Sequence, residues 1–152
     1  MTPTRIRASV VSERAAWVRS MLQAIQDLPM DSYAQFASDQ RNVAAAESFL
    51  RRGIEALLDL GRHILAKGFG YAVTEYKDIG NKLAEMGIIP DDRVATLRKI
   101  AGYRNRMVHF YHEITQEELY TICTSNITDI QEILEIIIKW IQNNPEKIDY
   151  EI

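Results

Sequence analysis

The segment Tyr103–His112, YRNRMVHFYH, holds the side chains of this chain that best suit acid–base chemistry on a phosphate group. Arginine is permanently charged and can donate two hydrogen bonds at once to phosphate oxygens. Histidine titrates near neutral pH and can therefore accept or donate a proton. Arg104 and His109 are accordingly the candidate pair, with Arg104 stabilising negative charge on the phosphorus oxygens and His109 moving a proton.

The spacing of Arg104 and His109 restricts how the two side chains can meet. In an uninterrupted α-helix they would lie roughly 140° apart around the axis, and so on different faces. They converge most easily if the helix ends or kinks there, or if two copies of the chain meet across a symmetry axis. The alternative interpretation is a helix end at which His109 and His112 cap carbonyl groups and the arginines are solvated.

The elements that must position this segment are almost all predicted to be helices. Apolar residues recur at spacings of three and four in each of them, and no strand-like alternation extends over a useful length. The expected helices cover residues 12–28, 32–67 with a possible break at 38–42, 76–86, a segment that starts at Pro90, and 115–143. This pattern predicts that residues 1–152 form one all-α, up-and-down bundle of about five helices.

Composition excludes several classes of protein. The chain has 152 residues, of which 47% are hydrophobic and 26% charged, as in ordinary globular domains. Its one cysteine, Cys123, rules out an intramolecular disulfide and a cysteine-based zinc site. No apolar run approaches the ~18 residues of a membrane span, and the first seventeen residues contain no stretch of signal-peptide length. We therefore expect a cytoplasmic protein with no membrane association.

Charge is distributed unevenly along the chain. The net charge of −3 argues against a protein that coats nucleic acid in general. Residues 93–112, however, carry five Lys and Arg and no Asp or Glu, whereas 113–152 carry nine acids and two lysines. The basic segment could attract an anionic ligand, and its Arg98 and Lys99 would raise the local concentration of one.

A polar stripe with a spacing of four residues runs along the helix expected over 32–67. Its members alternate in charge, as suits pairing one turn apart, and are Glu47, Arg51, Glu55, Asp59 and His63. Two interpretations remain open: Glu55, Asp59 and His63 border a cleft or a dimer seam, or the stripe is a solvated ladder of ion pairs. A di-metal carboxylate site would need Glu-x-x-His pairs, which the chain lacks. We therefore predict no metal and no cofactor.

The motif R-x4-H-x-Y, present here as RNRMVHFY, resembles that of HepT, the toxin of the HEPN/MNT toxin–antitoxin systems within the HEPN ribonuclease superfamily. Similarity continues on both sides of the motif and spans about 39–114, half of the chain. It includes the stripe with Glu55, Asp59 and His63, the segment Tyr76-Lys77-Asp78, and residues 83–89 and 97–105. The first and last thirds of the chain lie outside the resemblance. We expect the tail, residues 146–152, to be frayed or docked on a neighbouring molecule.

The resemblance implies a metal-independent endoribonuclease toxin of a type VII-like pair. Arg104 and His109 would be its catalytic residues, with Asn105 and Arg106 supporting them or contacting RNA. HEPN nucleases pair two protomers so that both motifs line one cleft, which implies a homodimer. A ribose 2′-OH as nucleophile would make RNA the substrate, which we expect to be tRNA, and would leave a 2′,3′-cyclic phosphate.

Tyr111, the tyrosine of the motif, has a separate implied role. In HepT-like toxins the antitoxin MntA, a minimal nucleotidyltransferase that uses ATP, is thought to attach AMP to this tyrosine. The added phosphate would repel RNA phosphate in the cleft. On the residues alone, the favoured interpretation is that Tyr111 is one of seven tyrosines and packs a helix end. The alternative function is a non-catalytic HEPN-like helical subunit that binds a nucleotidyltransferase partner or a nucleotide.

Overall fold

The computed structural model describes residues 5–109 and 114–150 and shows an all-α bundle, which confirms the predicted fold class. The α-helices are α1 (Ala8–Gln26), α2 (Tyr33–Ala37), α3 (Gln40–Phe69), α4 (Ile79–Glu85), α5 (Val94–His109), α6 (Gln116–Thr121) and α7 (Ile127–Asn143). The 3₁₀ turns η1 (Tyr76–Asp78), η2 (Asp91–Arg93) and η4 (Pro145–Lys147) and the π-helical turn η3 (Ile122–Asn126) connect or extend them. Strands β1 (Ile6–Arg7) and β2 (Ile148–Asp149) form a short parallel pair.

The helix expected over 32–67 divides into α2 and α3 within the polar cluster at 38–42. Side chains cap both pieces: Ser32 Oγ accepts the backbone N–H of Gln35 at 3.1 Å, and Asp39 Oδ1 accepts that of Arg41 at 2.9 Å. The expected end at residue 67 is two residues short, because α3 continues to Phe69. Gly70 then ends the helix in the left-handed conformation, with φ of 73°.

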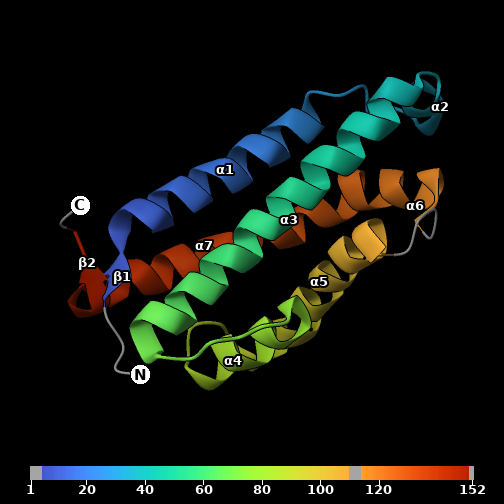
Figure 1. Ribbon diagram of the computed structural model, residues 1–152. Helices are drawn as coiled ribbons and strands as arrows, with labels where there is room; N and C mark the ends of the chain where they lie inside the picture. The colour runs from blue at the N-terminus through green and yellow to red at the C-terminus, as the bar shows by residue number, and fades with distance from the viewer. Residues whose placement is uncertain (1–4, 110–113, 151–152) are drawn as a thin grey trace.

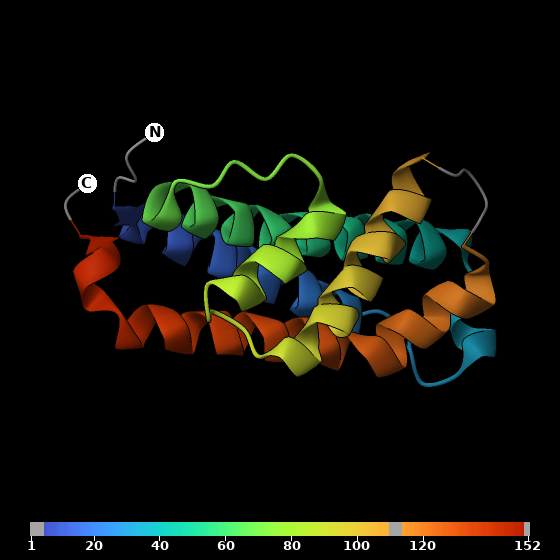
Figure 2. The same cartoon turned by 90° about the horizontal axis from the view of Figure 1, so that it is seen from below.

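Three long helices, α1, α3 and α7, run along the molecule, with α1 packed against α3 (Figure 1). Helices α4 and α5 lie across the face that α3 and α7 present (Figure 2), and α5 contacts both of those helices. The most buried of these elements is α3, whose apolar face includes Leu50, Ile54, Leu57, Leu58, Leu60, Ile64 and Leu65. Because α3 contacts α1, α4, α5 and α7, it is the scaffold on which α5 is held.

The C-terminal helix lies where the periodicity predicted it, but it is not continuous. Thr115 Oγ1 caps α6 by accepting the backbone N–H of Glu118 at 3.1 Å. The wider turn η3 then separates α6 from α7. The expectation of a frayed or docked tail is wrong for residues 148–149, because Ile148 is buried and pairs with Ile6 of the same chain.

Candidate functional site

Helix α5 holds the motif against the bundle through its apolar face. Leu97, Ile100, Ala101 and Tyr103 are buried, so the residues between and after them are turned towards the edge of the bundle. Arg104 is only partly exposed, and His109, the last residue of α5, is exposed. Both residues belong to α5, and His109 is the last residue described before residue 114.

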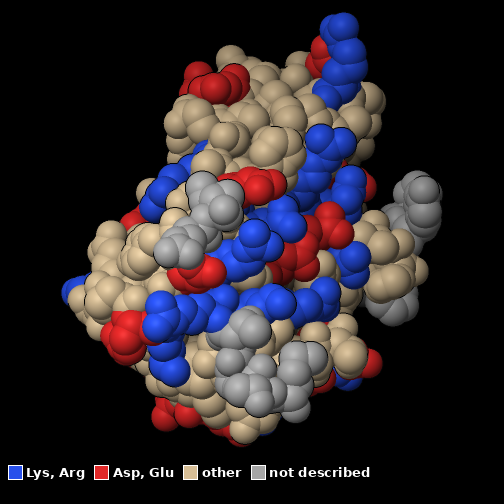
Figure 3. Space-filling model, turned by 60° about the vertical axis from the view of Figure 1, so that its left-hand side comes forward, with Lys and Arg blue, Asp and Glu red and all other residues tan. Residues whose placement is uncertain are grey.

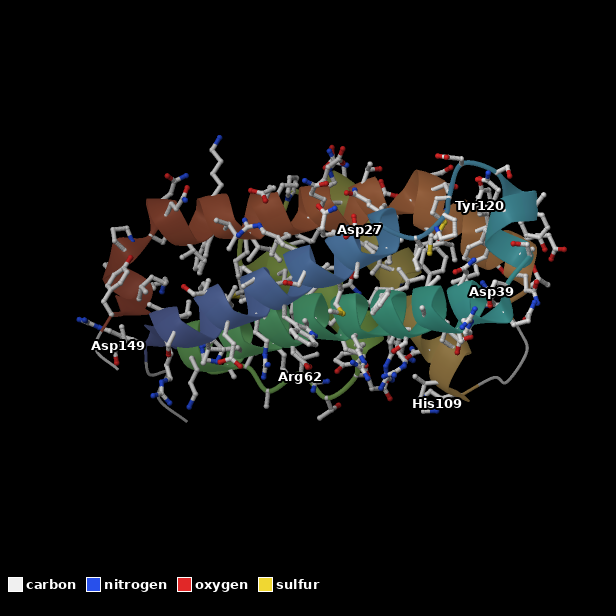
Figure 4. The ribbon with its side chains drawn as sticks, turned by 90° about the horizontal axis from the view of Figure 1, so that it is seen from above. Asp27, Asp39, Arg62, His109, Tyr120 and Asp149 are labelled. Carbon is white, nitrogen blue, oxygen red and sulfur yellow. The ribbon has the colours of Figure 1, made fainter. Side chains whose placement is uncertain are left out.

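The two residues line one pocket, with a volume of about 530 Å³. Helix α5 contributes Arg104, Asn105 and His109, and α3 contributes Arg62. The remaining lining residues come from the segment that leads into α4, namely Thr74, Glu75, Tyr76 and Lys77. Figure 4 shows that Arg62 and His109 project from the same side of the bundle. Three segments distant in sequence thus meet around the predicted catalytic pair.

Arg104 is fixed by partners from α3 and α5. Its Nε and Nη2 atoms donate to Glu55 Oε2 at 3.3 and 3.1 Å, and its Nη1 donates to Asn105 Oδ1 at 3.3 Å. Glu55 also accepts from Arg51 at 2.9 Å through its other oxygen. Because the Arg104 side chain is only 19% exposed, this ion pair is better shielded from solvent than a surface pair.

Tyr76 contacts two of the guanidinium groups in the pocket. The Cζ atoms of Arg62 and Arg104 lie 4.7 and 4.8 Å from the centre of its ring, within cation–π distance. Its hydroxyl donates to Asp59 Oδ1 at 2.8 Å. Burial and this hydrogen bond raise the pKa of Tyr76 to about 12, so its hydroxyl stays protonated at neutral pH.

Around Arg104, positively charged side chains outnumber negatively charged ones. The guanidinium groups of Arg51, Arg62 and Arg104 pair with two carboxylates, those of Glu55 and Asp59, and the Arg62–Asp59 distance is 3.7 Å. Lys77 and Glu75, at the pocket margin, pair with each other at 3.3 Å. A phosphate would therefore meet a surplus of positive charge, and the two carboxylates hold the arginines in place.

Arg106 lies away from this pocket. It makes a bidentate ion pair with Glu118 of α6, at 2.6 and 2.7 Å, and this hydrogen bonding lowers the pKa of the Glu118 carboxyl. Two residues of helix turn the chain by about 200°, so Arg104 and Arg106 lie on nearly opposite faces of α5. Lys99 and Arg106 line a separate pocket, and Arg98 is exposed. The predicted contact of Arg106 with RNA would thus be made outside the Arg104 pocket.

His63 is also separate from the Arg104 pocket. Its Nε2 accepts the backbone N–H of Arg7 at 3.1 Å, which ties α3 to β1. Burial, together with the nearby charges of Lys67, Arg7 and Arg14, lowers the pKa of His63. Of the three residues expected to border a cleft, Glu55 and Asp59 therefore contact pocket residues and His63 does not.

The sequence alone does not identify Arg62 as a pocket residue, and it points to Tyr76 only within the resemblance. The position of Arg62, three residues after Asp59, is the one local signal that could have indicated it. Tyr111 lies outside the described residues, two positions after His109. Within residues 5–109 and 114–150, no three His, Cys, Asp or Glu side chains are grouped so that they could hold a metal ion, and no helix is long and apolar enough to cross a membrane.

The described residues have the fold of a solved HEPN toxin, a class of helical bundles. The chain is similar to the solved structure of a tri-AMPylated HEPN toxin of Shewanella oneidensis in complex with its MNT antitoxin. The TM-score is 0.77 at 22% identity, over 86% of this chain and 97% of that one. The Bacillus subtilis cytosolic protein YutE is similar in fold as well, with a TM-score of 0.77 at 17% identity over 93% and 95% of the two chains.

Sequence comparison identifies the family within that class. A curated relative, the mRNA nuclease HepT of Shewanella oneidensis, is 23% identical over 128 residues, which cover 84% of this chain and 96% of the relative. The model of the ribonuclease HepT-like family matches residues 18–137, so this chain belongs to the ribonuclease HepT-like family. The resemblance drawn from R-x4-H-x-Y and its flanks is thereby confirmed.

Proposed function

We propose that this chain is an endoribonuclease toxin of a HEPN/MNT toxin–antitoxin pair and cleaves RNA without a metal ion through Arg104 and His109. The observation that carries the proposal is the single pocket in which α5 presents Arg104, Asn105 and His109 beside Arg62. Membership of the ribonuclease HepT-like family supports the reaction class. The name of the Shewanella relative points to mRNA as a substrate, beside the tRNA expected from the sequence.

In the proposed reaction the 2′-oxygen of a ribose attacks the adjacent phosphorus. The bond from phosphorus to the 5′-oxygen of the next nucleotide breaks, and a 2′,3′-cyclic phosphate remains. His109 takes the proton from the 2′-OH while water protonates the departing 5′-oxygen, or His109 gives that second proton while water takes the first. His109 suits either step, because it is exposed at the mouth of the pocket, where a substrate can reach it.

Arg104 stabilises the negative charge that grows on the two non-bridging phosphorus oxygens. A donor fixed before the reaction stabilises the transition state without reorganisation, and this is the main benefit of its contacts with Glu55 and Tyr76. Arg62 lies on the same Tyr76 ring and can contact a neighbouring phosphate. Asn105 holds the third nitrogen of the Arg104 guanidinium group.

AMPylation of Tyr111 by an MntA-type nucleotidyltransferase is the proposed means of neutralising the toxin. Two residues of chain span at most about 7 Å, so the backbone of Tyr111 lies within that distance of the backbone of His109. An AMP group there would add bulk and negative charge beside the surface that must accept RNA phosphate. The similar Shewanella toxin was solved in a tri-AMPylated form with its MNT antitoxin. A homodimer with both motifs facing one cleft belongs to the same proposal.

The proposal is tested with two substrates and two variants. Purified protein is incubated in EDTA with total tRNA and with an mRNA transcript, beside Arg104→Ala and His109→Ala, and the intact mass of each protein is recorded. We expect the parent to cut at least one of the RNAs and both variants to leave them intact. A DNA copy of the cut sequence should resist cleavage, because it has no 2′-OH.

The intact mass separates two explanations for an inactive parent protein. A mass increased by whole adenylyl groups would mean that the toxin was isolated in its neutralised form, and digestion with a phosphodiesterase should then restore cleavage. An unmodified protein that cuts neither RNA would contradict the proposal. Such a result would favour the non-catalytic HEPN-like subunit that binds a nucleotidyltransferase partner or a nucleotide.

A further inference from the structure

A second depression lies between α1 and α3 and borders the network around Arg104. It has a volume of about 200 Å³ and is lined by Arg14 and Trp17 of α1 and by Arg52, Glu55, Ala56 and Asp59 of α3. We call it the Trp17 groove. Its Glu55 and Asp59 are the residues that hold Arg104 and Tyr76 in the catalytic pocket. The Trp17 groove and the catalytic pocket therefore adjoin each other through these two side chains.

Trp17 is one of the few large hydrophobic residues of the described chain that are exposed. Its side chain is 44% exposed, and only Tyr71 and Tyr150 are comparably exposed among the large hydrophobic residues of the described chain. Neither of those tyrosines lines the Trp17 groove. A flat, accessible indole is the kind of surface on which a nucleic-acid base stacks, because every base has a π-face.

In the Trp17 groove, the arginine side chains are freer to bind a ligand than the carboxylates are. Within the described residues Arg52 is exposed and makes no side-chain hydrogen bond or ion pair, and Arg14 has only Glu13 at 4.0 Å. Glu55 and Asp59, in contrast, are already bound to arginines or to Tyr76. Figure 3 shows Lys and Arg side chains gathered in a band across one face of the molecule, with Asp and Glu among them.

Positive charge continues from the Trp17 groove towards β1. Arg14 is one of three cations, with Arg7 and Lys67, that contribute to the lowered pKa of His63. These residues lie on α1, β1 and α3, on the side of the groove away from α2. A polyanion that enters the Arg104 pocket could therefore extend along α1 and α3 in favourable potential.

We propose that the Trp17 groove is a subsite for a single-stranded stretch of the RNA substrate, in which Trp17 stacks on a base and Arg14 and Arg52 contact the flanking phosphates. The inference rests on the proposed function, since it extends the substrate site of the same enzyme. A protein partner fits the groove less well, because Asp and Glu are depleted at the centres of protein interfaces, and Glu55 and Asp59 lie beside Trp17.

Binding is measured first with an oligouridylate of about ten nucleotides that carries 2′-O-methyl groups, a length within the range that single-strand binding sites cover. This probe has no free 2′-OH and so cannot be cleaved by the proposed reaction. The chain has two tryptophans, and Trp140→Phe leaves Trp17 as the only one. We expect the probe to quench Trp17 fluorescence in that variant.

Substitutions then test the stacking and the phosphate contacts separately. Trp17→Ala should weaken probe binding about tenfold, because one base stack is lost. Arg52→Ala should reduce the slope of log affinity against log salt concentration by about 0.7, the value for one phosphate contact with a single strand. The matched controls are Tyr71→Ala, an exposed aromatic outside the groove, and Lys139→Ala, an exposed cation on α7; both should bind like the parent.

The outcomes separate this inference from the proposed function. Normal binding by Trp17→Ala and Arg52→Ala, with cleavage still lost in His109→Ala, would overturn the subsite and leave the ribonuclease. Loss of probe binding in Trp17→Ala, with no cleavage by the unmodified parent, would support an RNA-binding groove in a protein that is not a nuclease. A Trp17→Ala protein that loses only self-association in sedimentation would make the groove an interface between copies and would overturn the inference.

Discussion

Arg104 has three sets of contacts that orient it before any substrate binds. Glu55 accepts two of its hydrogen bonds, Asn105 accepts a third, and the Tyr76 ring lies beside its guanidinium group. These bonds engage three of the five N–H groups of the guanidinium, so the other two can donate to an incoming phosphate. His109, in contrast, is exposed and lines the same pocket from the last described turn of α5. Contacts within the fold thus orient Arg104, whereas the exposure of His109 makes it accessible to a substrate.

Replacement of His109 by alanine should remove activity without affecting stability. General acid–base catalysis by one positioned residue raises a rate by about 10²–10⁴-fold. The initial rate of RNA cleavage should therefore fall by at least about 10²-fold. Because His109 is exposed, the urea midpoint of unfolding should not change. A variant that unfolds at lower urea concentration would indicate a structural role for His109 instead.

Arg104→Lys tests whether geometry as well as charge is needed at this position. Lysine keeps the positive charge but loses the planar fork that reaches Glu55 and Asn105 and the stacking on Tyr76. We expect kcat to fall on the order of 10²-fold, the typical cost of removing one transition-state donor, with a smaller change in KM. Equal kcat for the two proteins would show that a point charge is sufficient.

At the scale of the elements, α5 can present the motif because α3 and α4 pack closely beneath it. A Cβ atom at Gly61 of α3 would lie 2.9 Å from Ile79 Cγ2 and 3.2 Å from Leu83 Cδ1 of α4, so only glycine allows this approach. The segment between α3 and α4 carries Tyr76 across to the Arg104 pocket. The helix periodicity predicted both helices, but the closeness of their packing depends on contacts between residues far apart in sequence.

Gly61→Ala and Gly102→Ala form a matched pair of variants. Both glycines lie inside helices, where alanine gains about 1 kcal/mol of helix propensity. Gly102 has nothing within 4 Å of a new Cβ, so its variant should gain stability by that amount. At Gly61 overpacking should outweigh the gain and destabilise the fold by about 1–3 kcal/mol. The free energy of unfolding in urea measures both, and a Gly61→Ala protein as stable as Gly102→Ala would contradict the close packing.

The contact between His63 and β1 should make stability depend on pH. Burial and the nearby charges of Lys67, Arg7 and Arg14 lower the pKa of His63 in the fold. Its Nε2 accepts the Arg7 N–H only when that nitrogen is unprotonated. The stabilisation is therefore complete above the unfolded pKa of about 6.5 and is lost as pH falls through the lowered value. His63→Gln should show a smaller loss of urea midpoint than the parent between pH 7.5 and 5.5. Parallel pH profiles for the two proteins would rule out this coupling.

At the scale of the whole molecule, the local patterns of the sequence predicted the helices and the motif better than they predicted the pocket. Periodicity is a local signal, and the structure has the helices that it indicated. Arg62 and Tyr76 reach Arg104 only through the packing of α3 and the segment before α4, which no local pattern encodes. The separation of Arg106 from Arg104, however, follows from helix geometry and was predictable.

The short pair of parallel strands at one end of the bundle is a second feature that local sequence patterns do not predict. Two residues in each strand are too few for an alternating pattern, and the partners are separated by almost the whole chain. Ile6 and Ile148 are nevertheless buried, so the pair joins the beginning of α1 to the segment that follows α7. Burial of these two side chains is a tertiary event, and the isolated tail sequence gave no indication of it.

The most direct test of the central claim is the chemistry of the ends that the protein leaves on RNA. An RNA that the unmodified parent cuts is treated in EDTA with the parent and with His109→Ala, and the 3′-ends of the products are identified by mass spectrometry. We predict 2′,3′-cyclic phosphate ends from the parent and no new ends from His109→Ala. Ends with a free 3′-hydroxyl, or equal cleavage by His109→Ala, would contradict a reaction in which the Arg104–His109 pocket directs the 2′-oxygen onto phosphorus.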